Sequence, residues 1–474
     1  MQATAWSTRG CLTGPARPVR PAAFTGPHGV DHAGAIALGS ATAMRISKAL
    51  AAGTSALLAA ALCTATAAPA AAEPRHRPSK PLADHVLFLA LDGFDAEYVG
   101  DAPMPNLDKL LRRGGLATST GVMTSITNPS WSSVATGAWP ERHRNTAYWY
   151  DAESGTARGQ QREMAVPTIG QAVREQGGTI LSAQWFTLQN YGTAYGDPEG
   201  IYTQPGGACP RRVDDAVAVL EGRPVDSGGT AVTAPKIPDL IAVYCDTLDS
   251  IGHDGGAEDP RIPEALRMID EQIGRLVEAV QEAGIYGRTT FVITGDHGMT
   301  TFTGGLNTEV VEAVAEAGYK LEYLGSGQRP APDTDAVMVV GGVGSLHLVG
   351  DAAGSRRAER RIAAALRDVP HVRAVYDERD QRRMRMSPNH GELVVEPEPG
   401  WSLGAAPASP KGSHGSTGDL RVPLVIAGAG VRPHAAAWRP RHVDVAPTMA
   451  ALLGIRPPSG VQGRVLGEVL QRRH

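Results

Sequence analysis

Short apolar runs alternate with amphipathic stretches along most of this chain. The runs have the length and composition of buried β-strands and cover residues 85–91, 239–245, 289–294 and 422–427. Weaker strand patterns cover residues 116–122 and 179–185. Helical patterns cover residues 106–113, 168–175, 261–283 and 442–453. This alternation predicts an α/β fold with a central, mostly parallel sheet flanked by helices.

A stretch rich in small and hydroxyl-bearing residues, 125–137, follows the strand predicted at 116–122. The pattern turns helical after Pro129, and proline favours the first helical position, so Thr127 is expected at or just before a helix N-terminus. Free N–H groups and the helix dipole make such a terminus a site for phosphate. A hydroxyl there can attack phosphorus once it is deprotonated. A simple helix cap made by Thr127 or Asn128 is the alternative.

Ionisable side chains follow three of the predicted strands, namely Asp92, Asp249, His253, Asp296 and His297. The carboxyl ends of parallel strands meet at one edge of a sheet, where ligands bind in open α/β folds. These residues are therefore expected to converge near Thr127. The alternatives are a turn at Asp92-Gly93 and an exposed ion pair between Asp249 and His253. His414, in a loop of small residues, is a candidate third imidazole or a solvated histidine.

Three carboxylates and three imidazoles suit a pair of borderline divalent cations, for which zinc is the best candidate. Two cations about 4 Å apart can clamp the attacking and leaving oxygens of an in-line phosphoryl displacement. A cation also lowers the pKa of a bound hydroxyl, which would activate Thr127. The predicted metal set is Asp92, Thr127, Asp249, His253, Asp296, His297 and His414.

In this order, the motifs resemble the alkaline-phosphatase superfamily and, within it, the type I phosphodiesterase/nucleotide pyrophosphatase family, over about residues 84–470. The matching motifs are Leu91-Asp92-Gly93-Phe94, Met104-Pro105-Asn106-Leu107-Asp108, Thr127-Asn128-Pro129, Thr136-Gly137 with Pro140 and His143, Asp249-Ser250-Ile251-Gly252-His253, Gly295-Asp296-His297-Gly298-Met299, Gly412-Ser413-His414-Gly415 and Asp444-Val445-Ala446-Pro447-Thr448.

The resemblance implies a metal-dependent hydrolase of phosphoric diester or pyrophosphate bonds. It implies one metal held by Asp249, His253 and His414 and a second held by Asp92, Asp296 and His297, with Thr127 as a bridging nucleophile that forms a covalent phosphoryl adduct. Alternatives are a phosphonate or phosphomonoester hydrolase, a phosphotransferase, and a metal-binding protein without catalysis.

Two departures from the family pattern concern the substrate. Ser130 stands where the family carries an asparagine that holds a phosphate oxygen, and Arg144 stands where a glycine is usual. The trio Thr127-Asn128-Pro129 is closer to the phosphonoacetate hydrolases of the same superfamily. Candidate substrate contacts are Asn128, Ser130 and Trp131, and packing in the core is the alternative for Trp131.

The chain is expected to divide into a catalytic core, residues 83–298 and 409–470, and an inserted α+β cap, residues 299–408. Within the cap, residues 337–349 and 392–395 have strand patterns, and residues 355–367 have a helical pattern. Insertions of this kind commonly cover a site and choose its substrate.

Composition and the N-terminal pattern indicate the class of the protein and its localisation. The 474 residues are 42% hydrophobic, as in globular proteins, and the net charge of -4 argues against a protein that coats nucleic acid. A basic start at Met44, an apolar run and small residues before Glu73 predict a signal peptide over residues 44–72, with residues 1–43 as an extension that is not native.

The predicted signal peptide implies a secreted protein. The motifs imply that it acts on a small phosphate ester. The apolar run of the signal peptide is too weak for a membrane span, and no stable span is expected in the mature chain. In a secreted protein Cys209 and Cys245 can form a disulfide, and two free buried thiols are the alternative. The sequence does not indicate an oligomeric state.

Overall fold

The structure of this chain is a computed structural model that describes residues 80–472. The predicted extension, residues 1–43, and the predicted signal peptide, residues 44–72, lie outside the described residues. Across residues 80–472, no helix is both long enough and apolar enough to cross a membrane.

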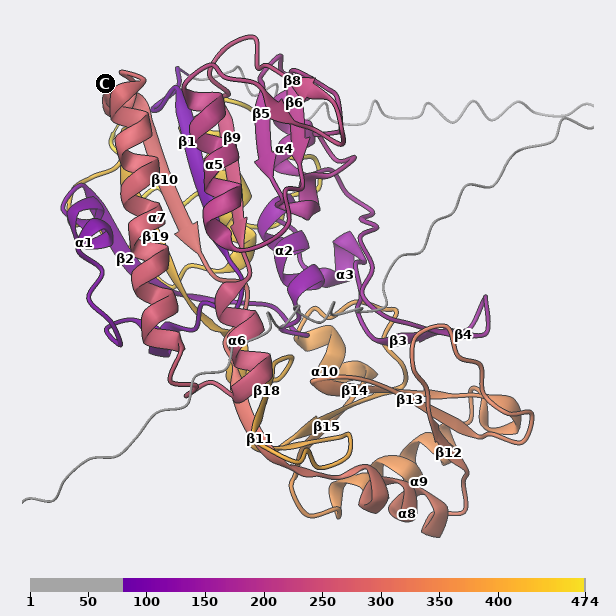
Figure 1. Cartoon of the computed structure of the whole chain (residues 1–474). Helices are drawn as coiled ribbons and strands as arrows, with labels where there is room; N and C mark the ends of the chain where they lie inside the picture. The colour runs from indigo at the N-terminus through magenta and orange to yellow at the C-terminus, as the bar shows by residue number, and fades with distance from the viewer. Residues whose placement is uncertain (1–79, 473–474) are drawn as a thin grey trace, which may run out of the picture. The chain divides into compact units, whose positions relative to one another are not determined.

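The main sheet has seven strands in the order β2-β19-β10-β1-β9-β5-β6 (Figure 1). Its strands are β2 (Gly114–Thr120), β19 (Arg421–Gly428), β10 (Thr289–Thr294), β1 (His85–Leu91), β9 (Leu240–Cys245), β5 (Ile180–Ala183) and β6 (Gly200–Thr203). The five strands from β10 to β6 are parallel, whereas β19 runs antiparallel to both β10 and β2. The predicted α/β class with a mostly parallel sheet is therefore confirmed.

Strand β1 shows why the central strands are apolar throughout. Leu87, Leu89 and Leu91 face one core, and Val86 and Phe88 face the other, because successive side chains of a strand point to opposite faces. The first core is covered by α1 (Pro105–Leu111), α5 (Cys209–Leu220) and α7 (Ile262–Glu282). The second is covered by α2 (Thr127–Thr136), α4 (Ile169–Glu175) and α11 (Val445–Leu452). A strand buried on both faces needs a continuous apolar run.

The part of the chain around this sheet includes three further helices and a hairpin. They are α3 (Pro140–His143), α6 (Thr247–Gly255), the hairpin of β7 (Val225–Asp226) and β8 (Ala231–Val232), and the short 3-10 helix His442–Asp444 before α11. Helix α1 is anchored by Asp270 of α7, whose carboxylate accepts from the N–H groups of Asn106 and Leu107. This contact explains the buried acidic residue in the long amphipathic helix.

A second sheet of five strands, in the order β12-β13-β14-β16-β15, forms most of the predicted cap region. Its strands are β12 (Leu321–Tyr323), β13 (Ala336–Gly341), β14 (Val343–Leu348), β16 (Leu393–Pro397) and β15 (Val372–Asp377). Helices α8 (Asn307–Glu316) and α9 (Arg356–Arg367) pack on it through a shared apolar cluster, and α10 (Glu378–Arg383) follows β15. Figure 1 shows these elements gathered together in orange tones.

Segments from outside residues 299–408 also join this region. The hairpin of β3 (Trp149–Asp151) and β4 (Thr156–Arg158) packs Tyr150 and Ala157 against Val337 and Val339 of β13. A three-stranded sheet, β17-β11-β18, consists of β17 (Gly400–Ser402), β11 (Thr300–Gly305) and β18 (Lys411–Ser413). The hairpin of β3 and β4 therefore shares an apolar cluster with a strand of the predicted cap.

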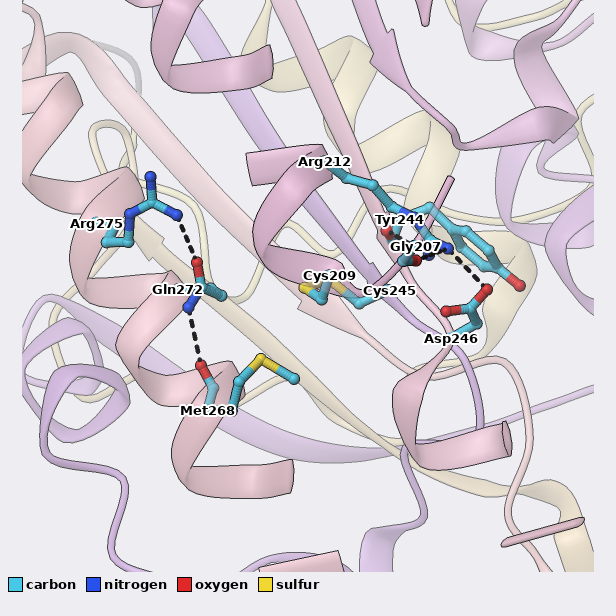
Figure 2. The surroundings of a disulfide bond; sticks show 9 residues. All are labelled: Gly207, Cys209, Arg212, Tyr244, Cys245, Asp246, Met268, Gln272 and Arg275. Atoms are coloured by element: carbon cyan, nitrogen blue, oxygen red, sulfur yellow. Dashed lines mark hydrogen bonds and ion pairs between the residues drawn. A yellow bond between two sulfur atoms is a disulfide. The ribbon is translucent and has the colours of Figure 1, made fainter. Parts of the chain in front are cut away.

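One local feature differs from the sequence expectation, and another decides between two alternatives. Helix α2 begins at Thr127 itself, so Pro129 is its third residue and not its first. Proline is tolerated there because the first N–H groups of a helix have no partner within the helix. Cys209 and Cys245 form a disulfide, with their Cα atoms 4.8 Å apart, so the alternative of two free thiols does not hold (Figure 2).

Candidate metal centre and nucleophile

The ionisable residues lie at the carboxyl ends of three adjacent parallel strands. Asp92 directly follows β1, and Asp296 and His297 follow β10. Helix α6, after β9, carries Asp249 and His253 one turn apart on one face. His414 reaches the same place from the loop after β18, and its side chain is 6% exposed. The structure thus brings together all six ligand candidates from the sequence.

Thr127 is placed at this edge by the start of α2. Ile126 before it is extended, and Thr127 is the first helical residue. Its Oγ1 lies 3.3 Å from Nε2 of His297, and the residue is 8% exposed. The Thr127 hydroxyl is therefore at the N-terminus of a ten-residue helix and beside an imidazole of the cluster.

Asp249, His253 and His414 form the first group of possible ligands. Nε2 of His253 lies 3.3 Å from Oδ1 of Asp249, Nε2 of His414 lies 3.5 Å from the same oxygen, and the two Nε2 atoms are 3.2 Å apart. Nδ1 of His253 donates to the carbonyl of Gly412, and Nδ1 of His414 donates to the carbonyl of Ser125, each at 3.0 Å. These bonds fix the tautomers and turn both Nε2 lone pairs toward Asp249, as in metal-binding histidines.

Asp92, Asp296 and His297 form the second group, and all three are buried. Nε2 of His297 lies 3.2 Å from Oδ1 of Asp92 and 3.3 Å from Oδ2 of Asp296, while its Nδ1 contacts the carbonyl of Gly298 at 2.9 Å. The other Asp296 oxygen accepts from the N–H of Gly93 at 3.0 Å. Single ligand atoms of Asp92, Asp249 and His297 also lie within 4.8 Å of one another, so the two groups adjoin.

These residues fit a pair of divalent cations. Oδ1 of Asp92, Oδ1 of Asp249 and Oδ2 of Asp296 are buried and accept no hydrogen bond. An unpaired buried carboxylate is costly, whereas a cation satisfies it. Burial and the charge of Asp92 raise the pKa of Asp249 to about 6. Burial alone would lower the pKa of His297, but the nearby carboxylates raise it to about 10. The cluster therefore demands positive charge and offers mixed oxygen and nitrogen donors.

A network behind the ligands fixes the junction between β9 and α6 (Figure 2). The guanidinium of Arg212 is buried and donates to the carbonyl of Tyr244 at 3.1 Å, to the carbonyl of Gly207 at 2.9 Å and to Asp246 at 2.9 Å. The disulfide ties Cys245 to the start of α5. The Tyr244 hydroxyl donates to Oδ2 of Asp92. Neither Arg212 nor Tyr244 lies in a motif of the sequence. Tyr244 falls within the apolar run of β9, so the pattern does not single out its hydroxyl as functional.

The three candidate substrate contacts have different surroundings. Trp131 is fully buried and packs edge-on against Phe88 and Trp185. It therefore packs in the core, as the alternative to a substrate contact proposed. Ser130 is also fully buried, and its hydroxyl has no hydrogen-bond partner among the described residues. The N–H of Asn128 accompanies Thr127 at the helix N-terminus and donates to Oε1 of Gln160 at 3.2 Å.

Comparisons with known proteins agree with this geometry. A model of the type I phosphodiesterase / nucleotide pyrophosphatase family matches residues 86–418. The chain belongs to this family, as its motifs predicted. Its relatives include the human ectonucleotide pyrophosphatase/phosphodiesterase family member 7, 29% identical over 261 residues that cover 52% of this chain and 54% of the relative. The chain spans about half the length of that protein and of its mouse counterpart.

Longer matches support the same family and the same fold. The bis(5'-adenosyl)-triphosphatase enpp4 of Xenopus laevis is 24% identical over 387 residues, which cover 78% of each chain. The solved structure of human ectonucleotide pyrophosphatase / phosphodiesterase 5 superposes with a TM-score of 0.61 at 17% identity, covering 79% of this chain and 96% of that one. The alkaline-phosphatase-like fold implied by the motifs is thereby confirmed. The names of these relatives are those of enzymes that act on phosphoric ester bonds.

Proposed function

We propose that this protein is a secreted, metal-dependent hydrolase that cleaves phosphoric diester or pyrophosphate bonds with Thr127 as its nucleophile. The observation that carries the proposal is the place of Thr127 Oγ1, at the N-terminus of α2 and 3.3 Å from His297, beside two groups of ligands with unsatisfied carboxylates. The family's phosphodiesterase and pyrophosphatase members support it.

The ligands divide between two cations as the family resemblance implies. Asp249, His253 and His414 would hold one cation, and Asp92, Asp296 and His297 would hold the other. Two divalent ions, with zinc best suited to these donors, would supply Lewis acidity and lower the pKa of the Thr127 hydroxyl. Thr127 Oγ1 contacts the second group directly, through His297.

The proposed reaction has two steps, and Thr127 takes part in both. The Thr127 hydroxyl gives its proton to solvent and Oγ1 attacks phosphorus in line. The P–O bond to the leaving group breaks, the leaving oxygen takes the electron pair, and the phosphoryl group is esterified to Thr127. Water then attacks the same phosphorus, and Thr127 leaves with its hydroxyl restored. Throughout, the N–H of Thr127 and the dipole at the start of α2 stabilise the negative phosphoryl oxygens.

The proposed substrate is a small phosphate ester. A solved structural neighbour, an inactive variant of murine ectonucleotide pyrophosphatase / phosphodiesterase 5, is in complex with AMP, which supports a nucleotide-like ligand. Secretion through the signal peptide of residues 44–72 is part of the proposal, and the disulfide of Cys209 and Cys245 suits an oxidising compartment.

The test compares kcat/KM for bis(4-nitrophenyl) phosphate and 4-nitrophenyl phosphate, with zinc supplied. We expect a strong preference for the diester. A preference for the monoester would contradict the phosphodiesterase assignment and favour a phosphomonoesterase. In parallel, Thr127→Ala should abolish turnover and keep its bound metal, with Thr136→Ala as a control in the same helix. Persistent activity of Thr127→Ala would exclude this nucleophile.

A further inference from the structure

The first turn of α2 offers few backbone donors to a phosphoryl group. Pro129 has no N–H, and the N–H of Ser130 already donates to the carbonyl of Ile126 at 3.0 Å. Only the N–H groups of Thr127 and Asn128 remain for other partners. The N–H of Asn128 donates to the side-chain carbonyl of Gln160 at 3.2 Å. The side chain of Gln160 is therefore bound next to the nucleophile.

The segment that carries Gln160 is held on both sides of it. The carbonyl of Gly159 accepts from the N–H of Tyr148 at 3.2 Å, and the carbonyl of Gln161 accepts from the side-chain amide of Asn128. Asn128 is buried, whereas Gln160 is exposed. The side chain of Gln160 thus reaches from the solvent side to the N-terminus of α2, at the residue next to Thr127.

These contacts also orient the amide of Gln160. Because Oε1 accepts from a backbone N–H, the two N–H bonds of Nε2 point away from Asn128. Burial raises the pKa of the Tyr148 hydroxyl, and the neighbouring side chain of Gln160 opposes that rise. Nε2 of Gln160 can then donate to a ligand beside Thr127.

We propose that Gln160 is a substrate-binding residue whose amide N–H donates to a non-bridging oxygen of the phosphoryl group attacked by Thr127. The inference rests on the proposed function and adds a neutral hydrogen-bond donor beside the nucleophile. A neutral amide matches the single negative charge of a diester. The doubly charged monoester is better matched by a cationic side chain. Gln160 therefore favours diesters.

The experiment measures kcat/KM of the full-length, zinc-supplied protein with bis(4-nitrophenyl) phosphate. Gln160→Ala should lower kcat/KM roughly 10- to 100-fold, the usual cost of losing one hydrogen bond to a charged group. Gln160→Glu keeps the acceptor for Asn128 but replaces the donor with a negative charge, so its loss should be at least as large. Gln161→Ala is the matched control, because Gln161 contacts Asn128 through its main-chain carbonyl, and it should keep wild-type kcat/KM.

Three further readings separate the possible outcomes. Thermal unfolding and zinc content should be unchanged in both variants of Gln160, which excludes a merely structural loss. The ratio of diester to monoester kcat/KM should fall in Gln160→Ala, since the monoester depends less on a neutral donor. An active wild type with equal kcat/KM for Gln160→Ala and Gln161→Ala would overturn this inference alone. A wild type without diesterase activity would instead overturn the proposed function.

Discussion

The hydroxyl of Tyr244 provides a sharp test of the metal centre, because Tyr244→Phe removes one oxygen atom and little else. This hydroxyl donates to Oδ2 of Asp92, and the residue is 6% exposed. Burial and the charges of Asp92 and Asp296 raise the pKa of Tyr244 well above its usual range, so the group stays a donor. It holds the carboxylate with Oδ1 turned toward His297, 3.2 Å away.

The expected size of the effect follows from this contact. A hydrogen bond to a charged group contributes about 1.5–3 kcal/mol, and loss of a partner that orients a metal ligand commonly costs roughly 10- to 100-fold in metal affinity. We therefore expect Tyr244→Phe to weaken zinc binding roughly 10- to 100-fold at one of two sites. The site held by Asp249, His253 and His414 should change little, since the Tyr244 hydroxyl donates to Asp92 and to none of those three side chains.

The assay is a titration of zinc against a chromophoric chelator of known affinity, with wild type, Tyr244→Phe and the control Tyr202→Phe. Tyr202 is a buried tyrosine of β6 whose hydroxyl contacts Gln204 at 3.4 Å, so its variant tests loss of a tyrosine hydroxyl away from Asp92. Equal zinc affinities for wild type and Tyr244→Phe would refute the claim that this hydroxyl orients a metal ligand.

Three other outcomes are expected. His297→Ala should lose bound metal because it removes a nitrogen ligand between two carboxylates, and unchanged zinc by elemental analysis would count against the ligand set. Replacing both Cys209 and Cys245 with alanine should lower the free energy of unfolding by about 4 kcal/mol, since the disulfide closes a loop with a separation of 36 residues; an unchanged urea midpoint would contradict this. Asp270→Ala should lower that free energy by about 1–3 kcal/mol, because two N–H groups of α1 lose their acceptor, and an unshifted melting temperature would argue otherwise.

The sequence predicts the centre of the fold better than its periphery. Strands such as β1 and β10 are buried on both faces, so their continuous apolar runs mark them directly. The hairpin of β3 and β4 is only three residues per strand and pairs its side chains with β13, far away in the chain. Nothing local in such short strands indicates where they pack.

The candidate site was likewise only partly predictable from the sequence. The ligand candidates could be found because each follows a strand or lies in a motif, and strand ends converge in a parallel sheet. Gln160 and Arg212 lie in no motif, and their contacts depend on how distant segments meet. Helix α2 is buried along its whole length, so its pattern gives no sign that Trp131 faces the core. The pairing of Cys209 with Cys245 likewise depends on where α5 meets the end of β9.

The most direct test of the account is to trap the phosphoryl adduct. The zinc-supplied protein is mixed with bis(4-nitrophenyl) phosphate, quenched in acid within one turnover and digested for peptide mass spectrometry. We expect a 4-nitrophenyl phosphoryl group on Thr127, and no adduct on that peptide in Thr127→Ala. An active enzyme that shows no adduct at any time within the turnover, or carries it on another residue, would contradict the central claim.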